Sequence, residues 1–256
     1  MLDDQLLDEI YNKLAKNDHN KFDERFDFAK KEFGLKYLPY TPKQLVKSVL
    51  ASKQANLSTM VHRTIIPIFD ENDILCGLSG RKKDDNKSRE NKYYNFLLKK
   101  QSCLYHVRKF RPQNFILVVE GFVDVMRIHH ELHLPVVATM GTTISEKQIE
   151  ILNNYGLPVH LMYDGDNAGK EGMLKIPYSQ LKVPIFVRKL EYDYDPDDWV
   201  KTGFILPEPI PYETWYIKTR SRENKKRFYQ DILIKSDVFF EKMVSSSETR
   251  KILDQL

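Results

Sequence analysis

Three short apolar runs, each followed by polar residues, dominate the middle of the chain. They are Phe115–Val119, Val136–Thr139 and His160–Tyr163, and the two segments between them have helical spacing. Each run is too short for a comfortable helix, and the first two are rich in β-branched residues. Strands that alternate with helices predict a parallel sheet with crossover helices.

Polar and glycine residues stand where these three runs stop. In chain order they are Glu120-Gly121, Met140-Gly141 and Asp164-Gly165-Asp166. Ligands of open parallel sheets bind beyond the carboxyl ends of the strands. The sequence therefore predicts that Glu120, Asp164 and Asp166 converge on one rim of the sheet.

A cluster of carboxylates at one rim indicates a metal site. Unpaired carboxylates repel each other and resist burial, and a divalent cation removes that penalty. Mg²⁺ takes hard oxygen ligands, usually one or two carboxylates, and completes its shell with water and substrate phosphate. Gly121 and Gly165, and Gly141 beside them, allow tight turns or a close approach of backbone or phosphate. Residues 164–167 alone are more typical of a turn, but the three motifs together favour a metal site.

Three strings in this region carry a family resemblance. They are EGFVDV at 120–125, ATMGT at 138–142 and YDGDNAG at 163–169. They resemble the Toprim domain, which is shared by DnaG-type primases, topoisomerases and some nucleases, and they are most similar to the DnaG-type primase version. The resemblance covers roughly residues 20–200 and is specific within 115–198.

A second acidic motif follows a fourth apolar run, at 184–190, which is predicted to be a strand. Asp195-Pro196-Asp197 is similar to the DPD motif of the family. A turn with a helix cap is the alternative on the residues alone, but the place after a strand favours a second metal-binding pair. Before it, Asn167 is expected to cap a helix that Pro177 ends or kinks.

The N-terminal 112 residues are predicted to form a mixed α+β subdomain. Apolar spacing predicts one helix through Leu6, Leu7, Ile10 and Leu14, and a second through Phe22, Phe26, Ala29 and Phe33 that ends at Gly34. Pro42 is expected to open a third helix that runs to about Lys53. Residues 61–80 predict a hairpin that turns at 71–73.

Basic and aromatic residues follow the hairpin. Residues 81–92 alone are typical of a solvated loop, but the strings around them resemble family segments that hold template and nascent strand. The candidates for binding nucleic acid or NTP are Arg81, Lys92, Tyr93, Asn95 and Lys100. Cations pair with backbone phosphates, and a nearby aromatic ring can stack on a base.

Bulk properties exclude several classes of protein. No apolar run approaches the roughly 20 residues that span a bilayer, and no signal-peptide pattern is present, so a cytoplasmic location is expected. Cys76 and Cys103 make neither a disulfide framework nor a four-ligand zinc site, so no structural zinc is expected. The net charge of +4 is compatible with nucleic acid.

These observations predict an α/β protein with a Toprim-type parallel sheet and flanking helices. A mixed α+β N-terminal subdomain with the basic segment (1–112) precedes the Toprim metal-binding subdomain (113–200), and a short helical tail (201–256) follows. The compact size favours an origin in a phage or mobile element.

The resemblance implies a DNA primase core, an enzyme that makes short RNA primers on single-stranded DNA by nucleotidyl transfer. It implies two Mg²⁺ or Mn²⁺ ions held by Glu120, Asp164, Asp166, Asp195 and Asp197, with Glu120 as ligand or as general acid/base. The implied partners are template DNA, RNA primer and NTPs, with a replicative helicase or a separate zinc-bearing initiation factor. A Toprim nuclease and a non-catalytic DNA-binding accessory subunit are the alternatives.

Overall fold

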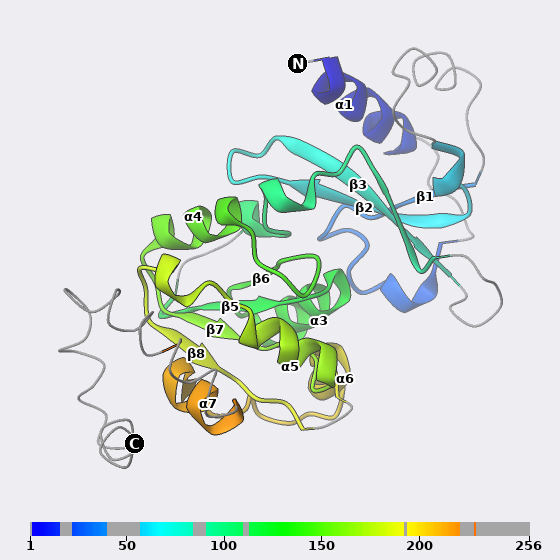
Figure 1. The fold of residues 1–256 in the computed structure, drawn as a ribbon. Coiled ribbons are helices and arrows are strands. Elements are labelled where there is room, and N and C mark those ends of the chain that lie inside the picture. The colour runs from blue at the N-terminus through cyan, green and yellow to red at the C-terminus, as the bar shows by residue number, and fades with distance from the viewer. Residues whose placement is uncertain are drawn as a thin grey trace. The chain divides into compact units, whose positions relative to one another are not determined.

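The computed structural model describes residues 2–15, 22–39, 57–83, 91–109, 113–191, 194–220 and 228. The chain divides into two compact units, Met1–Lys109 and Phe110–Leu256, and each contains its own sheet (Figure 1). Three predictions fall outside the described residues: the helix from Pro42, most of the basic loop at 81–92, and nearly all of the tail beyond 220.

The first unit is built on a four-stranded antiparallel sheet in the order β1-β2-β3-β4. Its strands are β1 (Lys36–Leu38), β2 (Arg63–Phe69), β3 (Leu75–Lys82) and β4 (Tyr93–Phe96). Strands β2 and β3 confirm the predicted hairpin. Helix α1 (Leu2–Ala15) contributes buried Leu7, Ile10 and Leu14 to a core that it shares with β2 and β3.

The predicted second helix is wrong. Residues 22–34 form the short 3-10 helix η1 (Glu24–Phe26) followed by turns, and the chain leaves at Gly34 with φ +63°. The four apolar residues that suggested a helix are buried nonetheless: Phe22, Phe26, Ala29 and Phe33. Turns bury these side chains instead of an α-helix, because Asp23 accepts a hydrogen bond from the Arg25 N–H and so starts a tight 3-10 turn at this point. Three more 3-10 helices complete the unit: η2 (Leu57–Met60), η3 (Lys100–Ser102) and η4 (Val107–Lys109).

The second unit confirms the predicted parallel sheet. Its strand order is β6-β5-β7-β8-β9, in which β9 alone is antiparallel to its neighbour. The strands are β5 (Ile116–Val119), β6 (Val136–Ala138), β7 (Val159–Leu161), β8 (Ile185–Val187) and β9 (Ile210–Pro211). The helices are α3 (Phe122–Leu132), α4 (Glu146–Tyr155), α5 (Asn167–Leu174), η5 (Tyr178–Gln180), α6 (Pro196–Lys201) and α7 (Tyr212–Thr219).

Local signals set the ends of these helices. Ser145 and Gln148 form a capping box at the start of α4, and Gly156 ends it with φ +64°. Helix α5 stops at Leu174, before Pro177, as predicted. Helix α3 packs against both β6 and α6, and this packing matters for the acidic site.

Residues beyond 200 continue the second unit through β9 and α7. The Tyr178 hydroxyl donates to the Glu213 carboxylate, and the Tyr212 hydroxyl donates to the Met173 carbonyl at 2.7 Å. These bonds join α7 to the last turn of α5 and to η5. Among the described residues, no helix combines the length and the hydropathy needed to cross a lipid bilayer.

His160 is a buried histidine in the central strand β7. Its ring stacks on Phe115 at 4.3 Å, and its Nδ1 accepts a hydrogen bond from Arg188 Nε at 3.0 Å. Burial, together with the Arg188 charge, lowers the pKa of His160 to about 4. The folded state therefore holds this imidazole neutral.

We expect acid to destabilise the second unit through His160. The unfolded state takes up a proton below pH about 6.5 that the folded state refuses until about 4, so stability falls as pH falls through that window. At pH 5 the loss should be about 1–2 kcal/mol, discounted for partial solvent screening. Urea unfolding at pH 7.5 and pH 5 measures it. His160→Gln keeps an acceptor for Arg188 and should remove most of the difference; an equal acid loss in both proteins would contradict the assignment.

Candidate metal centre and nucleic-acid face

Glu120 is the residue directly after β5, the fully buried strand Ile116–Val119. Its Oε1 accepts a hydrogen bond from the Asp164 backbone N–H at 3.3 Å. Burial, with smaller contributions from the Asp164 and Asp166 charges, raises the pKa of Glu120 to about 7. The first predicted pair of strand ends therefore does come together.

Asp164 and Asp166 lie on the turn that leads from β7 into α5. Asp166, and not Asn167 as predicted, caps α5: its Oδ1 accepts from the Gly169 N–H at 2.8 Å. Asn167 is instead the first residue of the helix. The cap bond uses Oδ1, so Oδ2 can still serve as a ligand.

Glycines allow the segments around Asp164 to approach one another. A Cβ on Gly165 would lie 2.1 Å from the Glu191 carbonyl oxygen, and the Gly165 N–H donates to the Tyr194 carbonyl at 2.8 Å. A Cβ on Gly169 would lie 2.3 Å from the Asp164 carbonyl oxygen and 2.9 Å from Glu120 Oε1. Both positions need glycine for space and not for a left-handed backbone.

The other two predicted glycines differ from each other. A Cβ on Gly121 would lie 2.5 Å from Asp124 Oδ2, whereas one on Gly141 would meet nothing within 4 Å. The left-handed residue of the Met140-Gly141 turn is Met140, with φ +62°. Close approach therefore explains Gly121 but not Gly141.

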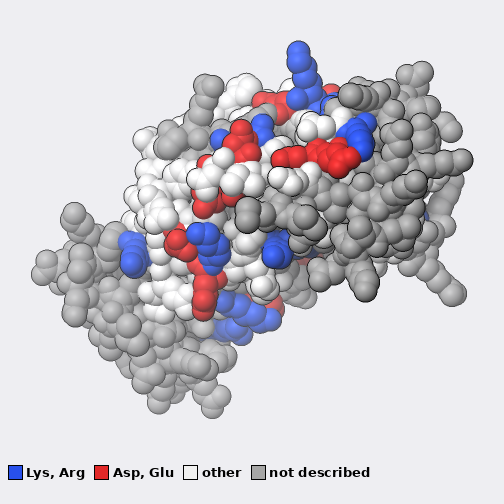
Figure 2. Space-filling view, turned by 90° about the horizontal axis from the view of Figure 1, so that it is seen from above, with Lys and Arg blue, Asp and Glu red and all other residues white. Residues whose placement is uncertain are grey.

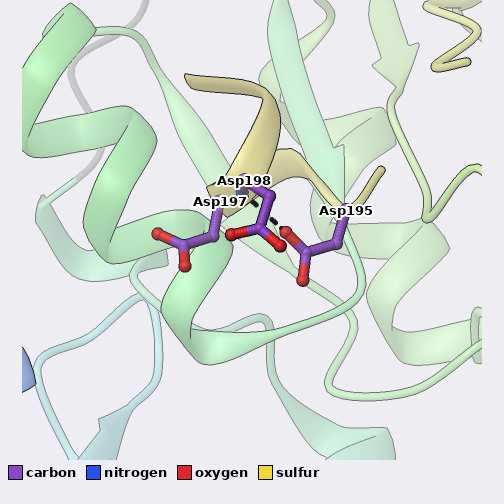
Figure 3. A group of neighbouring side chains, drawn as sticks. All are labelled: Asp195, Asp197 and Asp198. Atoms are coloured by element: carbon purple, nitrogen blue, oxygen red, sulfur yellow. Dashed lines mark hydrogen bonds between the residues drawn. The ribbon is translucent and has the colours of Figure 1, made fainter. Parts of the chain in front are cut away.

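Three more carboxylates gather at the start of α6. Ligand oxygens of Asp195, Asp197 and Asp198 lie within 4.8 Å of one another (Figure 3). Asp195 caps the helix through the Asp198 N–H at 2.7 Å, and Pro196 takes the first helical position. The motif begins eight residues after Val187, the last residue of β8, and it forms the predicted helix cap. Its role as a metal-binding pair stays a prediction.

Asp124 is a central residue that the sequence reasoning did not single out. It is buried in the first turn of α3, where its Oδ2 accepts from the Gly121 N–H at 3.1 Å and its Oδ1 from the Asp197 N–H at 3.2 Å. Burial, then the charges of Asp164, Asp195 and Asp197, raises its pKa well above the usual range. The available signal was its place three residues after Gly121, where acidic side chains bond back to a helix start.

The residues present fit a divalent cation. Neighbouring carboxylate charges contribute to the raised pKa values of both Glu120 and Asp124. A dication would replace that repulsion by attraction, and carboxylate oxygens are the donors that Mg²⁺ and Mn²⁺ prefer. The predicted residues that would hold such an ion are Glu120, Asp164, Asp166, Asp195 and Asp197.

The predicted nucleic-acid residues lie in the first unit, mostly along β3 and β4. Arg81 and Tyr93 are register partners, and the Arg81 guanidinium carbon lies 5.4 and 5.2 Å from the ring centroids of Phe26 and Tyr93. Asn95, two residues on, accepts from Ser79 Oγ at 2.9 Å. Alternation along a strand places Tyr93 and Asn95 on one face.

Two of these candidates are placed differently. Lys92 is exposed just before β4, with Nζ 6.0 Å from the Tyr93 ring centroid, whereas Arg81 is buried. Lys100 lies apart from the strands, in η3. On the face drawn in Figure 2, acidic and basic side chains of the described residues form small mixed groups.

Comparison with known proteins places this geometry in a family context. A family model described as Toprim-like matches residues 117–200. This region is similar to Toprim-like domains. It contains Glu120, Asp164, Asp166, Asp195 and Asp197.

Curated relatives of the Toprim-like domain and its flanking residues are bacterial DNA primases. The DNA primase of Staphylococcus epidermidis is 35% identical over 150 residues, which is 55% of this chain and 25% of that protein. The DNA primase of Aquifex aeolicus is 32% identical over 151 residues, 55% of this chain and 30% of that protein. The matches thus span about a quarter to a third of the length of these relatives.

Solved structures extend the likeness beyond the Toprim-like domain. The zinc-binding and RNA polymerase domains of the Aquifex aeolicus primase match with a TM-score of 0.76 and 23% identity, over 97% of this chain and 72% of that one. The RNA polymerase domain of Mycobacterium tuberculosis primase DnaG matches with a TM-score of 0.75 and 18% identity, over 98% and 97%. The chain has the fold of a DnaG-type primase catalytic core.

Proposed function

We propose that this chain is the catalytic core of a DNA primase, which joins ribonucleotides on a single-stranded DNA template. The observation that carries the proposal is the meeting of Glu120 with the Asp164 turn at the carboxyl ends of β5 and β7, in a chain whose sequence relatives are DNA primases. A solved DnaG catalytic domain bound to single-stranded DNA has the same fold, with a TM-score of 0.71. The cytoplasm, where a template is available, is the proposed location.

In the proposed reaction a primer 3′-hydroxyl attacks the α-phosphate of an NTP, and pyrophosphate leaves. Bound Mg²⁺ or Mn²⁺, two ions in this proposal, would lower the pKa of the nucleophile and neutralise charge on the phosphoryl group. Asp164 and Asp166 on the turn between β7 and α5, and Asp195 at the start of α6, would supply carboxylate oxygens to these ions. Glu120, with a pKa of about 7, can act as a ligand when ionised or exchange a proton with the hydroxyl.

One assay separates the proposal from its alternatives. Single-stranded template, labelled NTPs and Mn²⁺ should give new RNA with the wild-type chain and none with Asp164→Asn. Template cleavage without RNA would identify a Toprim nuclease that uses the same carboxylates. Binding without either product would identify a non-catalytic accessory subunit.

Lys92→Ala should weaken single-strand binding and lower the salt dependence of the affinity by about one phosphate contact. Lys92 is exposed beside Tyr93, so its ammonium can reach a backbone phosphate while the ring stacks on a base. Fluorescence anisotropy of labelled oligo(dT) from 50 to 300 mM salt measures both quantities. Lys147→Ala, which removes an exposed lysine from α4, is the matched control; equal effects of the two variants would show that only net charge matters.

Arg81→Ala should lower both the stability of the first unit and the affinity for single-stranded DNA, because Arg81 is buried and its guanidinium lies near the rings of Phe26 and Tyr93. Lys100→Ala tests whether η3 contributes to the same binding face. We propose these residues, with Tyr93 and Asn95, as contacts to template, primer or NTP. A replicative helicase or a zinc-bearing initiation factor remains part of the proposal as a partner.

We expect this chain alone to extend an annealed primer better than it starts one. Extension requires metal, template and NTP, whereas initiation also requires two free NTPs to be held without a duplex. A zinc site that reads the start sequence needs about four Cys or His ligands at close spacing, and the chain has only Cys76 and Cys103 as cysteines. Primed and bare templates at equal NTP and Mn²⁺ give the comparison. Efficient sequence-specific initiation by zinc-free protein would contradict the expectation.

A further inference from the structure

The Asp197 carboxylate is bonded to two cationic side chains. Arg127 Nε, from α3, donates to Oδ1 at 2.9 Å, and Lys201 Nζ, from the last turn of α6, donates to Oδ2. The Asp197 side chain is only 12% exposed and that of Arg127 only 17%. Both carboxylate oxygens therefore accept hydrogen bonds from positively charged groups, and the carboxylate is largely shielded from solvent.

The backbone of Asp197 is held by the same helix. Its N–H donates to Asp124, and Asp124 and Arg127 are three residues apart, so they project from one face of α3 toward α6. Arg127 is itself oriented by Glu131, one turn further on, at 3.1 Å. Figure 3 shows the Asp197 carboxylate turned away from those of Asp195 and Asp198.

These contacts distinguish Asp197 from Asp195, although ligand oxygens of the two lie within 4.8 Å of each other. A dication bound to Asp197 would have to displace Arg127 or Lys201, or lie against both of them. Like charges at such distances repel strongly where water is excluded. Asp195, by contrast, uses one oxygen for a neutral cap bond to the Asp198 N–H.

We propose that Arg127 is a positioning residue that, with Lys201, neutralises Asp197 and removes it from the metal-ligand set. Divalent ions are then held by Glu120, Asp164, Asp166 and Asp195, and Asp197 acts as the anchor that ties α6 to α3. The inference rests on the proposed function for its metal, but the Arg127–Asp197 contact itself does not.

Mn²⁺ binding to the full chain, followed by the EPR signal of the free ion, tests the ligand set. Asp164→Asn should weaken binding at least about tenfold, and Asp197→Asn should change it less than about threefold. Arg127→Gln removes a repelling charge and frees a carboxylate, so it should tighten binding several-fold or add a bound ion. Arg127→Lys should behave like the wild type, and Glu131→Gln, which leaves the Asp197 contact in place, is the matched control.

Equal weakening by Asp197→Asn and Asp164→Asn would overturn the inference. So would Arg127→Gln binding Mn²⁺ as the wild type does, because a purely structural arginine has no reason to oppose the ion. A gain in affinity is the result that only a counter-charge role predicts.

Thermal unfolding without metal separates failure of this inference from failure of the proposed function. Arg127→Gln and Asp197→Asn should each lower the Tm, and the double variant should lie no lower than the worse single variant, because both remove one interaction. Additive losses would overturn the ion pair. A wild-type chain that binds no Mn²⁺ would overturn the proposed catalysis, while the metal-free cycle would still decide the role of Arg127.

Discussion

Asp164→Asn combined with Asp166→Ser is expected to abolish the metal centre while leaving the fold in place. Serine at 166 keeps an oxygen that can cap α5, so the variant loses two carboxylates but not the helix start. Mn²⁺ affinity should fall by at least about 100-fold, and primer extension by about 10²–10³-fold or more. Calorimetric titration with Mn²⁺ and an extension assay on a primed template measure the two effects.

Circular dichroism and the Tm serve as controls for that variant, and Glu150→Ala provides a matched one. Glu150 is an exposed carboxylate on α4 that pairs with Lys147, so its removal changes net charge without touching the site. Unchanged Mn²⁺ binding in the Asp164/Asp166 double variant would show that the carboxylates at the ends of β5 and β7 do not form the centre.

Gly169→Ala should have the second largest effect, although alanine is the better helix former by about 1 kcal/mol. The added methyl group would lie 2.3 Å from the Asp164 carbonyl oxygen and 2.9 Å from Glu120 Oε1, so α5 must move away from both. We expect a loss of about 1–3 kcal/mol in the free energy of unfolding. Mn²⁺ affinity should fall as well, because Asp164 and Glu120 shift relative to each other.

Gly141→Ala is the stability control for that substitution. Its Cβ would meet nothing within 4 Å, so its free energy of unfolding should change by no more than about 0.5 kcal/mol. Urea unfolding of both variants gives the comparison. Equal stabilities would mean that α5 can retreat from the Asp164 turn without cost.

The parallel sheet could be predicted because each of its main strands is a short apolar run bounded by polar residues. Strands β5, β6 and β8 fall within predicted runs, and β7 begins one residue before its predicted run and overlaps it. Strands β1, β4 and β9 could not be found in this way, since none of them stands out as an apolar run and each depends on pairing with another strand. Residues 22–34 show the opposite error. Their apolar residues have helical spacing, but the structure buries them on a 3-10 helix and turns.

The acidic site likewise contains some residues that the sequence could predict and others that it could not. Glu120 and Asp164 could be predicted because they follow strands in the local sequence, and parallel strands end at one rim. The contacts of Asp124 and Arg127 with Asp197 could not, because they depend on the packing of α3 against α6; only the bond from the Gly121 N–H to Asp124 has a local signal. The helix cap at Asp166 is set by the local sequence, but the sequence could not decide between Asp166 and Asn167, because both residue types cap helices well.

The bond from the Asp197 N–H to Asp124 spans 73 positions of sequence, and this has a consequence for synthesis on the ribosome. Residues 116–138 can pair and pack as soon as they emerge, because β5, α3 and β6 are consecutive. The Asp124 side chain then remains exposed to water until α6 has been synthesised. Only when α6 has left the exit tunnel can that carboxyl group be buried and the rim closed. A nascent chain released before that point would carry Glu120 and Asp124 beside the paired strands β5 and β6. It would lack α6, to which Asp124 is bonded in the folded protein.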